Sequence, residues 1–103
     1  MTYLKINDTL YPATFRERIQ DNDWQNRRSM FITVGMGYEQ AAQTFVNGLQ
    51  WSVVNQTEDE TQTRDCSEFE VAGSITDNRN GTVTVKMGVL LDSEALSIIL
   101  GEV

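Results

Sequence analysis

The 103-residue sequence contains no histidine and a single cysteine, Cys66. Without histidine, the chain lacks the commonest general base, the Ser–His and Cys–His nucleophile pairs and the commonest transition-metal ligand. One cysteine can form neither a thiolate zinc site nor an internal disulfide, and it suits a reducing compartment. Because Asp65 and Glu68 lie close by, we expect this thiol to stay protonated and inert. The sequence therefore predicts a protein that is not an enzyme and has no metal or cofactor.

Long hydrophobic segments are also missing. No apolar run approaches the roughly 20 residues of a membrane-spanning helix. The first residues, Met1–Asp8, lack a basic region followed by an apolar stretch, so we expect no signal peptide. A single proline and 40% hydrophobic residues argue against disorder, and the length suffices for one modest core. These features predict a single domain, residues 1–103, in a cytoplasm and away from membranes.

Positive charge is scarce and unevenly placed. Eight Lys and Arg against fifteen Asp and Glu give a net charge of −7, and the isoelectric point is near 4.3. Since affinity for phosphate backbones depends on Lys and Arg, we expect no nucleic-acid partner. Residues 16–28 nevertheless hold four of the six arginines, whereas residues 57–70 hold six acids against Arg64 alone. These two segments can pair within the fold or between copies of the chain.

The clearest local pattern is a β-hairpin around Asn80-Gly81. A two-residue turn would split the apolar side chains between the two faces of the ribbon, whereas a three-residue loop, residues 79–81, keeps them together. This register pairs Asn78 with Thr82 and puts three pairs on one face: Ile75 with Val85, Val71 with Val89, and Phe69 with Leu91. We therefore predict a type I turn followed by Gly81 in the left-handed conformation, a G1 bulge.

The remaining patterns predict short strands and two helices. Strands are expected from Tyr3 to Ile6, Leu10 to Ile19, Met30 to Val34, and Leu49 to Val54, with a turn at Asn7-Asp8. Pro12 indicates an edge position within its strand. Leu49, Trp51 and Val53 are expected on one face of the strand from Leu49 to Val54. A helix of about ten residues begins near Tyr38 and is closed by Asn47-Gly48, and a short C-terminal helix begins at Asp92-Ser93-Glu94, with Leu96, Ile99 and Leu100 on its apolar side. Residues 56–67 read as a mobile acidic loop.

Together these elements predict an α+β fold. We expect a mostly antiparallel sheet of about five or six strands, with one helix packed on a face and a short C-terminal helix. Gly35-Met36-Gly37 lies between a strand and a helix, as in a dinucleotide-binding turn, but the third small residue of that fingerprint is replaced by Gln40. The two glycines are therefore interpreted as freeing a turn.

Two kinds of binding surface follow from the residues. Trp24 lies near Arg27 and Arg28, and tryptophan and arginine are enriched at the energetic centres of interfaces. Trp24 can instead pack onto its own domain. The complementary candidate is Glu58-Asp59-Glu60, which is interpreted as a flexible acidic loop rather than a metal site. The leading hypothesis is a non-enzymatic module that binds a protein partner or itself. The alternative is a small-ligand or carbohydrate-binding domain that stacks its ligand on Trp24, Trp51 or Tyr38.

Three segments together resemble a known group of proteins. They are Leu4–Asn7; Arg28–Val34 continuing through Tyr38–Ala41 to Trp51-Ser52; and Ile75–Asp77 continuing through Gly81–Gly88. Their order is similar to small, mostly uncharacterised proteins encoded in prophage-type regions of Gram-positive (Firmicute) genomes, some of which lie near tail genes. This resemblance brings no catalytic residue with it. It implies a virion-associated or accessory interaction protein, associated with a phage tail or its assembly and made in a bacterial cytoplasm.

Overall fold

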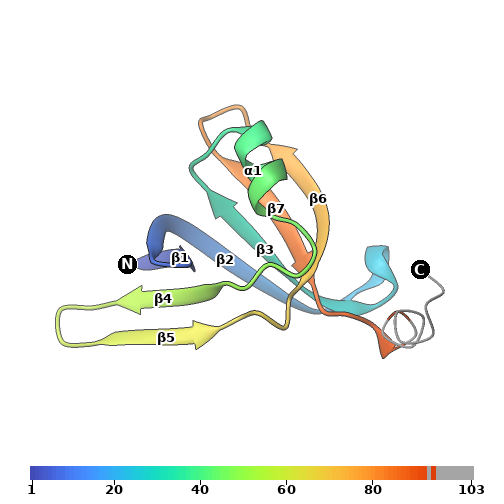
Figure 1. Ribbon diagram of the computed structural model, residues 1–103, viewed down its shortest axis with the longest axis horizontal. Coiled ribbons are helices and arrows are strands. Elements are labelled where there is room, and N and C mark those ends of the chain that lie inside the picture. The colour runs from blue at the N-terminus through green and yellow to red at the C-terminus, as the bar shows by residue number, and fades with distance from the viewer. Residues whose placement is uncertain (93, 95–103) are drawn as a thin grey trace.

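Seven strands form one antiparallel sheet in the computed structural model, which describes residues 1–92 and 94 (Figure 1). The strands are β1 (Thr2–Ile6), β2 (Thr9–Asp21), β3 (Arg27–Val34), β4 (Ser52–Gln56), β5 (Thr61–Asp65), β6 (Val71–Asp77) and β7 (Val83–Gly88). They lie in the order β5-β4-β1-β2-β3-β7-β6. Helix α1 (Tyr38–Thr44) lies against β6 and β7, and a 3-10 turn, η1 (Asn22–Trp24), joins β2 to β3. The α+β class and the antiparallel sheet with a helix on one face are confirmed. The expected number of strands was too low.

The long strand β2 joins the two halves of the sheet. Its 13 residues pair first with β1, up to Pro12 opposite Tyr3, and then with β3 from Ala13 opposite Val34 onward. Although β2 lies in the middle of the sheet, Pro12 occupies an edge position within it, as expected. Pro12 is tolerated there because β3 has already ended at Val34, so β2 has a strand neighbour on one side only at that point.

The additional strand arises from the segment that was expected to be a mobile acidic loop. Residues 61–65 form β5, which pairs with β4 from Gln56 opposite Thr61 to Ser52 opposite Asp65. All five residues of β5 are exposed, so no burial pattern marks the strand in the sequence. Alternating Thr61 and Thr63 favour an extended backbone, and pairing with β4 supplies its hydrogen bonds. The interpretation of residues 56–67 as a loop therefore needs correction.

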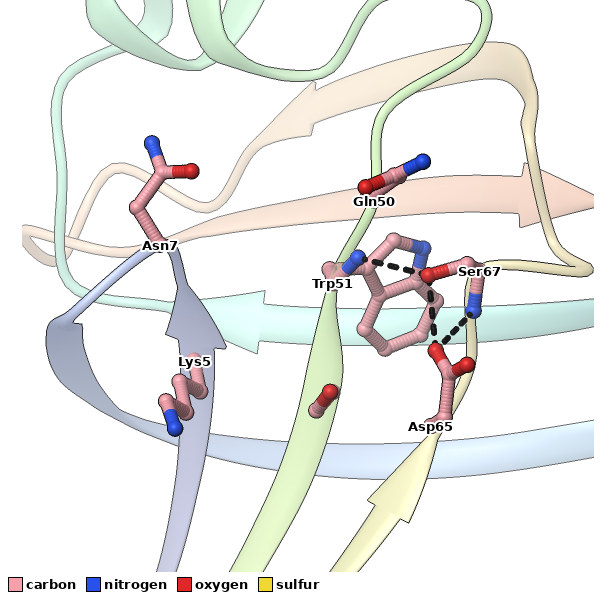
Figure 2. Close-up of a pocket in the computed structure, with 7 residues that line it drawn as sticks. Lys5, Asn7, Gln50, Trp51, Asp65 and Ser67 are labelled. Carbon is pink, nitrogen blue, oxygen red and sulfur yellow. Dashed lines mark hydrogen bonds between the residues drawn. The ribbon is translucent and has the colours of Figure 1, made fainter.

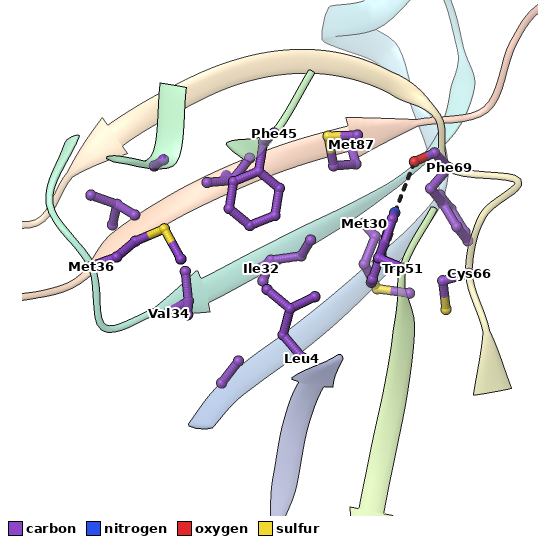
Figure 3. Close-up of a cluster of buried hydrophobic side chains, with 14 residues drawn as sticks. Leu4, Met30, Ile32, Val34, Met36, Phe45, Trp51, Cys66, Phe69 and Met87 are labelled. Atoms are coloured by element: carbon purple, nitrogen blue, oxygen red, sulfur yellow. Dashed lines mark hydrogen bonds between the residues drawn. The ribbon is translucent and has the colours of Figure 1, made fainter. Parts of the chain in front are cut away.

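The core lies between the concave face of the sheet, α1 and the loop that follows β5 (Figure 3). Its larger members come from β1, β3, β7 and the irregular segments around β4 and β5: Leu4, Met30, Ile32, Val34, Phe45, Trp51, Phe69 and Met87. The Trp51 indole nitrogen donates to the Phe69 carbonyl at 3.0 Å. Burial also raises the pKa of the Cys66 thiol, which is fully enclosed. Leu49, Trp51 and Val53 all contact this core, as expected for side chains on one face, and Val53 lies opposite Leu4. The strand itself is shorter than expected, because β4 begins only at Ser52.

The helix is shorter than expected. Helix α1 has seven residues, buries Ala41 completely, and ends where the Phe45 amide donates to the Ala41 carbonyl at 2.9 Å. Gly48 follows outside it, in a left-handed conformation with φ of 86°. The predicted C-terminal helix lies outside the described residues beyond Asp92 and Glu94. Within residues 1–92 and 94, no helix has both the length and the apolar character needed to cross a membrane.

The β6–β7 hairpin has the predicted loop length and the predicted register near its turn. Ile75 lies opposite Val85, the Asn78 amide donates to the Thr82 carbonyl at 3.1 Å, and Gly81 has φ of 86°. The turn type differs, since Arg79 also has a positive φ of 60° and its amide donates to the Asp77 carboxylate. Further along, a bulge between Ala72 and Ile75 places Val71 opposite Gly88 instead of Val89. The predicted far pairs were therefore wrong.

The left-handed Gly81 gives a first prediction. Gly81→Ala should lower the free energy of unfolding by about 1–2 kcal/mol, because a Cβ is disfavoured at this φ. No atom lies within 4 Å of the added methyl group, so the cost is conformational and not steric. Gly81→Asn is the matched control and should lose less, since Asn visits this region more readily. Equal stability of the wild type and Gly81→Ala in urea denaturation would contradict the turn assignment.

Candidate interaction surface

The outer face of the sheet, opposite α1 and the core, carries an unusual set of side chains. Along β3, Met30, Ile32 and Val34 are buried in the core, so Phe31 and Thr33 lie on the opposite face. In the neighbouring strands, Arg16 and Lys86 lie directly opposite Phe31. The strand register therefore surrounds an aromatic ring on the outer face with cations.

Three cations surround the Phe31 ring. The guanidinium carbons of Arg16 and Arg18 lie 4.8 and 5.5 Å from the ring centroid, and the Lys86 ammonium nitrogen lies at 5.4 Å. Lys86 is also 5.2 Å from the Trp24 ring, which in turn lies 4.4 Å from the Arg27 guanidinium carbon. Each such contact is worth about 0.5–1 kcal/mol at an exposed site. We call this row of alternating charges and rings, Arg16, Arg18, Phe31, Lys86, Trp24 and Arg27, the cation–aromatic ladder.

Trp24 rests on a shelf of backbone made by two glycines. A Cβ at Gly73 would lie 2.8 Å from Trp24 Cη2 and 2.9 Å from the Lys86 carbonyl oxygen. A Cβ at Gly88 would lie 2.8 Å from Trp24 Cζ3. The indole therefore packs closely on its own sheet and is half-buried. This is the arrangement in which Trp24 packs onto its own domain, with one of its faces turned to Arg27.

A bulge in β2 places the carboxylate of Asp21 beside the cations of this face. The register shifts between Arg18 and Asp21, so that these two residues reach the same side of the strand. The fully buried Asp21 carboxylate forms ion pairs with Lys86 and Arg18 and accepts hydrogen bonds from the Asp23 amide and the Ser29 hydroxyl. The hydrogen bond from Lys86 is the main reason that the pKa of Asp21 lies below its usual value. Lys86 is thereby fixed between the two aromatic rings.

Arg27 is committed to contacts within the fold. It is 2% exposed, and its two terminal nitrogens each donate to one oxygen of Glu94 at 3.0 Å. It also donates to the carbonyls of Trp24 and Val89. The guanidinium of Arg27 lowers the pKa of the Glu94 carboxyl group. Its remaining role on the outer face is therefore to hold the indole of Trp24.

Arg28 lies on the other side of β3 from Arg27, within a four-charge network. Glu17 accepts from Arg28 at 2.7 Å and from Arg64 at 3.2 Å, and Glu68 accepts from Arg28 at 3.2 Å. The hydrogen bond from Arg28 is the main cause that lowers the pKa of Glu17. Here the arginine-rich and acid-rich segments of the sequence pair within one molecule. The network attaches the end of β5 to β2 and β3.

The remaining predicted contact residues lie elsewhere. Glu58, Asp59 and Glu60 form the turn between β4 and β5, are exposed, and occupy one extreme end of the molecule (Figure 1). The structure thus brings Trp24 and Arg27 together, but separates them from these acids. Our sequence reasoning missed Phe31 and Lys86. The alternation of residues 27–34 could have placed Phe31 on the outer face, whereas no sequence signal joins Lys86 to a bulged Asp21.

A groove continues from the ladder along the outer face. Its volume is about 260 Å³, and it is lined by Thr14, Phe15, Arg16, Phe31, Thr33 and Thr84. The Thr33 and Thr84 hydroxyls lie 3.1 Å apart. Arg16 is exposed, and within residues 1–92 and 94 it forms no ion pair. We call this feature the threonine groove. A guanidinium beside hydroxyl donors suits a carboxylate or a similar small anion.

A second pocket, of about 340 Å³, lies between β1, β4 and the end of β5 (Figure 2). Figure 2 shows Lys5 and Asn7 on its β1 side, and Asp65 and Ser67 on its β5 side. The Ser67 hydroxyl donates to Asp65 at 2.7 Å, and this bond is the main cause that lowers the pKa of Asp65. A carboxylate with a lowered pKa is a weak base, so it accepts the serine hydrogen bond without removing the proton. This cluster is therefore a turn-forming arrangement and not an activated nucleophile.

Comparisons with known proteins give no relative for this chain. The sequence matches no protein-family model, and it has no significant match among curated proteins or solved structures. Among the described residues, no group of three or more Cys, Asp or Glu side chains is placed to hold a metal ion.

The glycine shelf gives a second prediction. Gly73→Ala should lower the free energy of unfolding by about 1–3 kcal/mol, because its methyl group would overlap the Lys86 carbonyl and the Trp24 ring. The tryptophan emission spectrum of the folded protein should also shift as the indole is displaced. Gly35→Ala is the control, since its Cβ would meet only an ordinary contact at 3.9 Å. Equal stability and equal emission of the two variants would contradict the packing of Trp24.

The lowered pKa values give a third prediction, in acid. The pKa values of Glu17, Asp21, Asp65 and Glu94 are all lowered in the folded state, so the folded protein binds fewer protons than the unfolded chain. The stabilisation is complete above the ordinary values of 3.8 and 4.5, and it is lost as the pH falls through the lowered ones. Urea denaturation should therefore show constant stability from pH 7 to about 5 and a decline below. Asp21→Asn should decline less steeply; a slope identical to that of the wild type would contradict the role of Asp21.

Proposed function

We propose that the protein is a non-enzymatic interaction module whose outer sheet face binds an acidic segment of a protein. We further propose that it is a structural or assembly component of a phage or prophage tail, made in a bacterial cytoplasm. The observation that carries the first proposal is the cation–aromatic ladder with the adjoining threonine groove. The resemblance of three segments of the sequence to small prophage-encoded proteins supports the second.

Charge complementarity favours an acidic partner. The chain has a net charge of −7, yet four of its eight cations gather on one face around Phe31 and Trp24. Asp21 and Glu94 neutralise part of this charge, but Arg16 retains open donor positions at the edge of the groove. A carboxylate from a partner can bind there by charge-assisted hydrogen bonds, which are worth about 1.5–3 kcal/mol. The half-buried Phe31 ring beside it supplies apolar contact area.

The size and chemistry of the groove favour a protein segment over a small ligand. Its volume of about 260 Å³ is below the usual range of ligand pockets. Of the aromatic residues first considered as stacking platforms, Trp51 is buried against Phe15 and Trp24 covers the glycine shelf. Tyr38, at the start of α1, is 52% exposed but lies apart from both pockets. The carbohydrate-binding alternative is therefore less well supported.

A single-stranded nucleic acid is the competing occupant to exclude by experiment. Aromatic rings between cations on a sheet face are typical of proteins that stack bases. The overall charge of −7 opposes a polyanion, however, and the whole sequence has four Lys and Arg residues outside the ladder.

A fourth prediction tests the acidic-segment proposal by fluorescence anisotropy. A labelled peptide rich in Glu and Asp should bind the protein, and binding should weaken as salt is raised. Arg16→Gln should weaken it by about tenfold, which corresponds to the loss of one charge-assisted hydrogen bond. Lys5→Gln is the matched control, because it removes one charge at the other pocket and should leave the affinity unchanged.

Three outcomes would contradict the proposal. The first is that the acidic peptide does not bind at low salt. The second is that a peptide with Gln and Asn in place of its acids binds equally well. The third is that a single-stranded oligonucleotide of the same charge binds more tightly and depends on Phe31.

A further inference from the structure

The turn between β4 and β5 carries three consecutive exposed acids. We call Glu58, Asp59 and Glu60 the acidic tip. The Thr57 amide and hydroxyl donate to the Glu60 carbonyl at 2.9 and 3.2 Å, and the Glu60 amide donates back to the Thr57 hydroxyl. Three consecutive exposed acids are thus held on a narrow, ordered two-stranded arm. An ordered tip loses little conformational entropy when it binds.

The acidic tip has no cationic partner in its own molecule among the described residues. None of its three carboxylates takes part in an ion pair within residues 1–92 and 94, and the same is true of Arg16 in the groove. Figure 1 shows the β4–β5 arm projecting to one end of the molecule, away from the middle of β3. The maximum extent of the chain along that axis is 47 Å. The two complementary surfaces are therefore placed to meet between copies and not within one copy.

We propose that the acidic tip of one copy docks in the threonine groove of a second copy. This inference rests on the proposed function and names its partner. The carboxylates of Glu58 and Asp59 would accept from the Arg16 guanidinium and from the threonine hydroxyls of the groove. The cation–aromatic ladder next to the groove adds a positive field that favours this orientation.

The two docking surfaces differ, so the contact is heterologous. Each copy offers one tip and one groove, which gives head-to-tail association that either closes into a ring or continues as a filament. A hairpin tip covers much less surface than the roughly 1,200–2,000 Å² of a stable interface. Association should therefore be weak, concentration-dependent and strongly screened by salt, as expected for a component that assembles at high local concentration.

The test uses two full-length variants that each disable one side of the contact. The groove variant is Arg16→Gln, and the tip variant combines Glu58→Gln, Asp59→Asn and Glu60→Gln. All four positions are exposed, so both variants should fold, which circular dichroism and urea denaturation will verify. The matched controls are Lys5→Gln for the lost cation and Glu39→Gln, on the exposed first turn of α1, for a lost acid.

The association state of each variant is to be measured by sedimentation velocity over a concentration series at low salt. The wild type and both controls should form species larger than a dimer, whereas each disabled variant alone should stay monomeric. An equimolar mixture of the two variants retains one intact contact, the tip of the groove variant in the groove of the tip variant. This mixture should form a dimer and nothing larger, and high salt should dissociate it.

Other results would overturn the inference, and they separate it from the proposed function. A wild type that stays monomeric at all concentrations, or disabled variants that still associate, would overturn it. So would a mixture without a dimer. Any of these results can be combined with the peptide-binding experiment. If the labelled acidic peptide still binds and its binding depends on Arg16, the groove has a different acidic partner and the proposed function stands. If the peptide does not bind either, both proposals fail.

Discussion

The contact between the buried Asp21 carboxylate and the Lys86 ammonium group organises the outer face of the sheet. Asp21 comes from the end of β2, beyond a bulge, and Lys86 from β7, so the ion pair ties the two strands that flank β3. It holds Lys86 between the rings of Phe31 and Trp24. Additional hydrogen bonds from Ser29 and the Asp23 amide satisfy the carboxylate, which a buried charge requires. Lys86 in turn contacts both aromatic rings of the ladder and so joins its two halves.

The two faces of the sheet separate two kinds of interaction. The inner face and α1 enclose the apolar core, with Trp51, Phe69 and Met87 among its largest members. Cations and aromatic rings occupy the outer face, where they need no second layer of structure to cover them. Glu17 and Arg28 lie beside this core, where Arg28 pairs with Glu17 and with Glu68 after β5. The core can therefore hold the fold while the outer face stays available for a partner.

The sequence predicted those features that depend on local pattern. Alternation and a left-handed glycine placed the β6–β7 turn correctly, and the apolar residues of 30–34 marked a strand that forms part of β3. The predictions from the sequence were wrong where pairing between distant segments, and not the local residue pattern, decides the structure. Strand β5 has no buried face, so only its pairing with β4 makes it a strand. The bulge between Ala72 and Ile75 and the bulge between Arg18 and Asp21 shift the register by one residue each, and the sequence pattern did not predict either of them. The ladder joins residues up to 70 positions apart, which explains why Trp24 and Arg27 were found without Lys86 and Phe31.

The most direct test of the central claim is a map of the binding surface by nuclear magnetic resonance. Titration of the acid-rich peptide into isotope-labelled protein should shift the amide signals of the threonine groove, at Thr14, Arg16, Phe31, Thr33 and Thr84. The signals of Lys5, Asn7 and Ser52 in the other pocket should stay in place. Shifts confined to that second pocket, or spread evenly over the molecule, would contradict an outer face built to bind acidic segments.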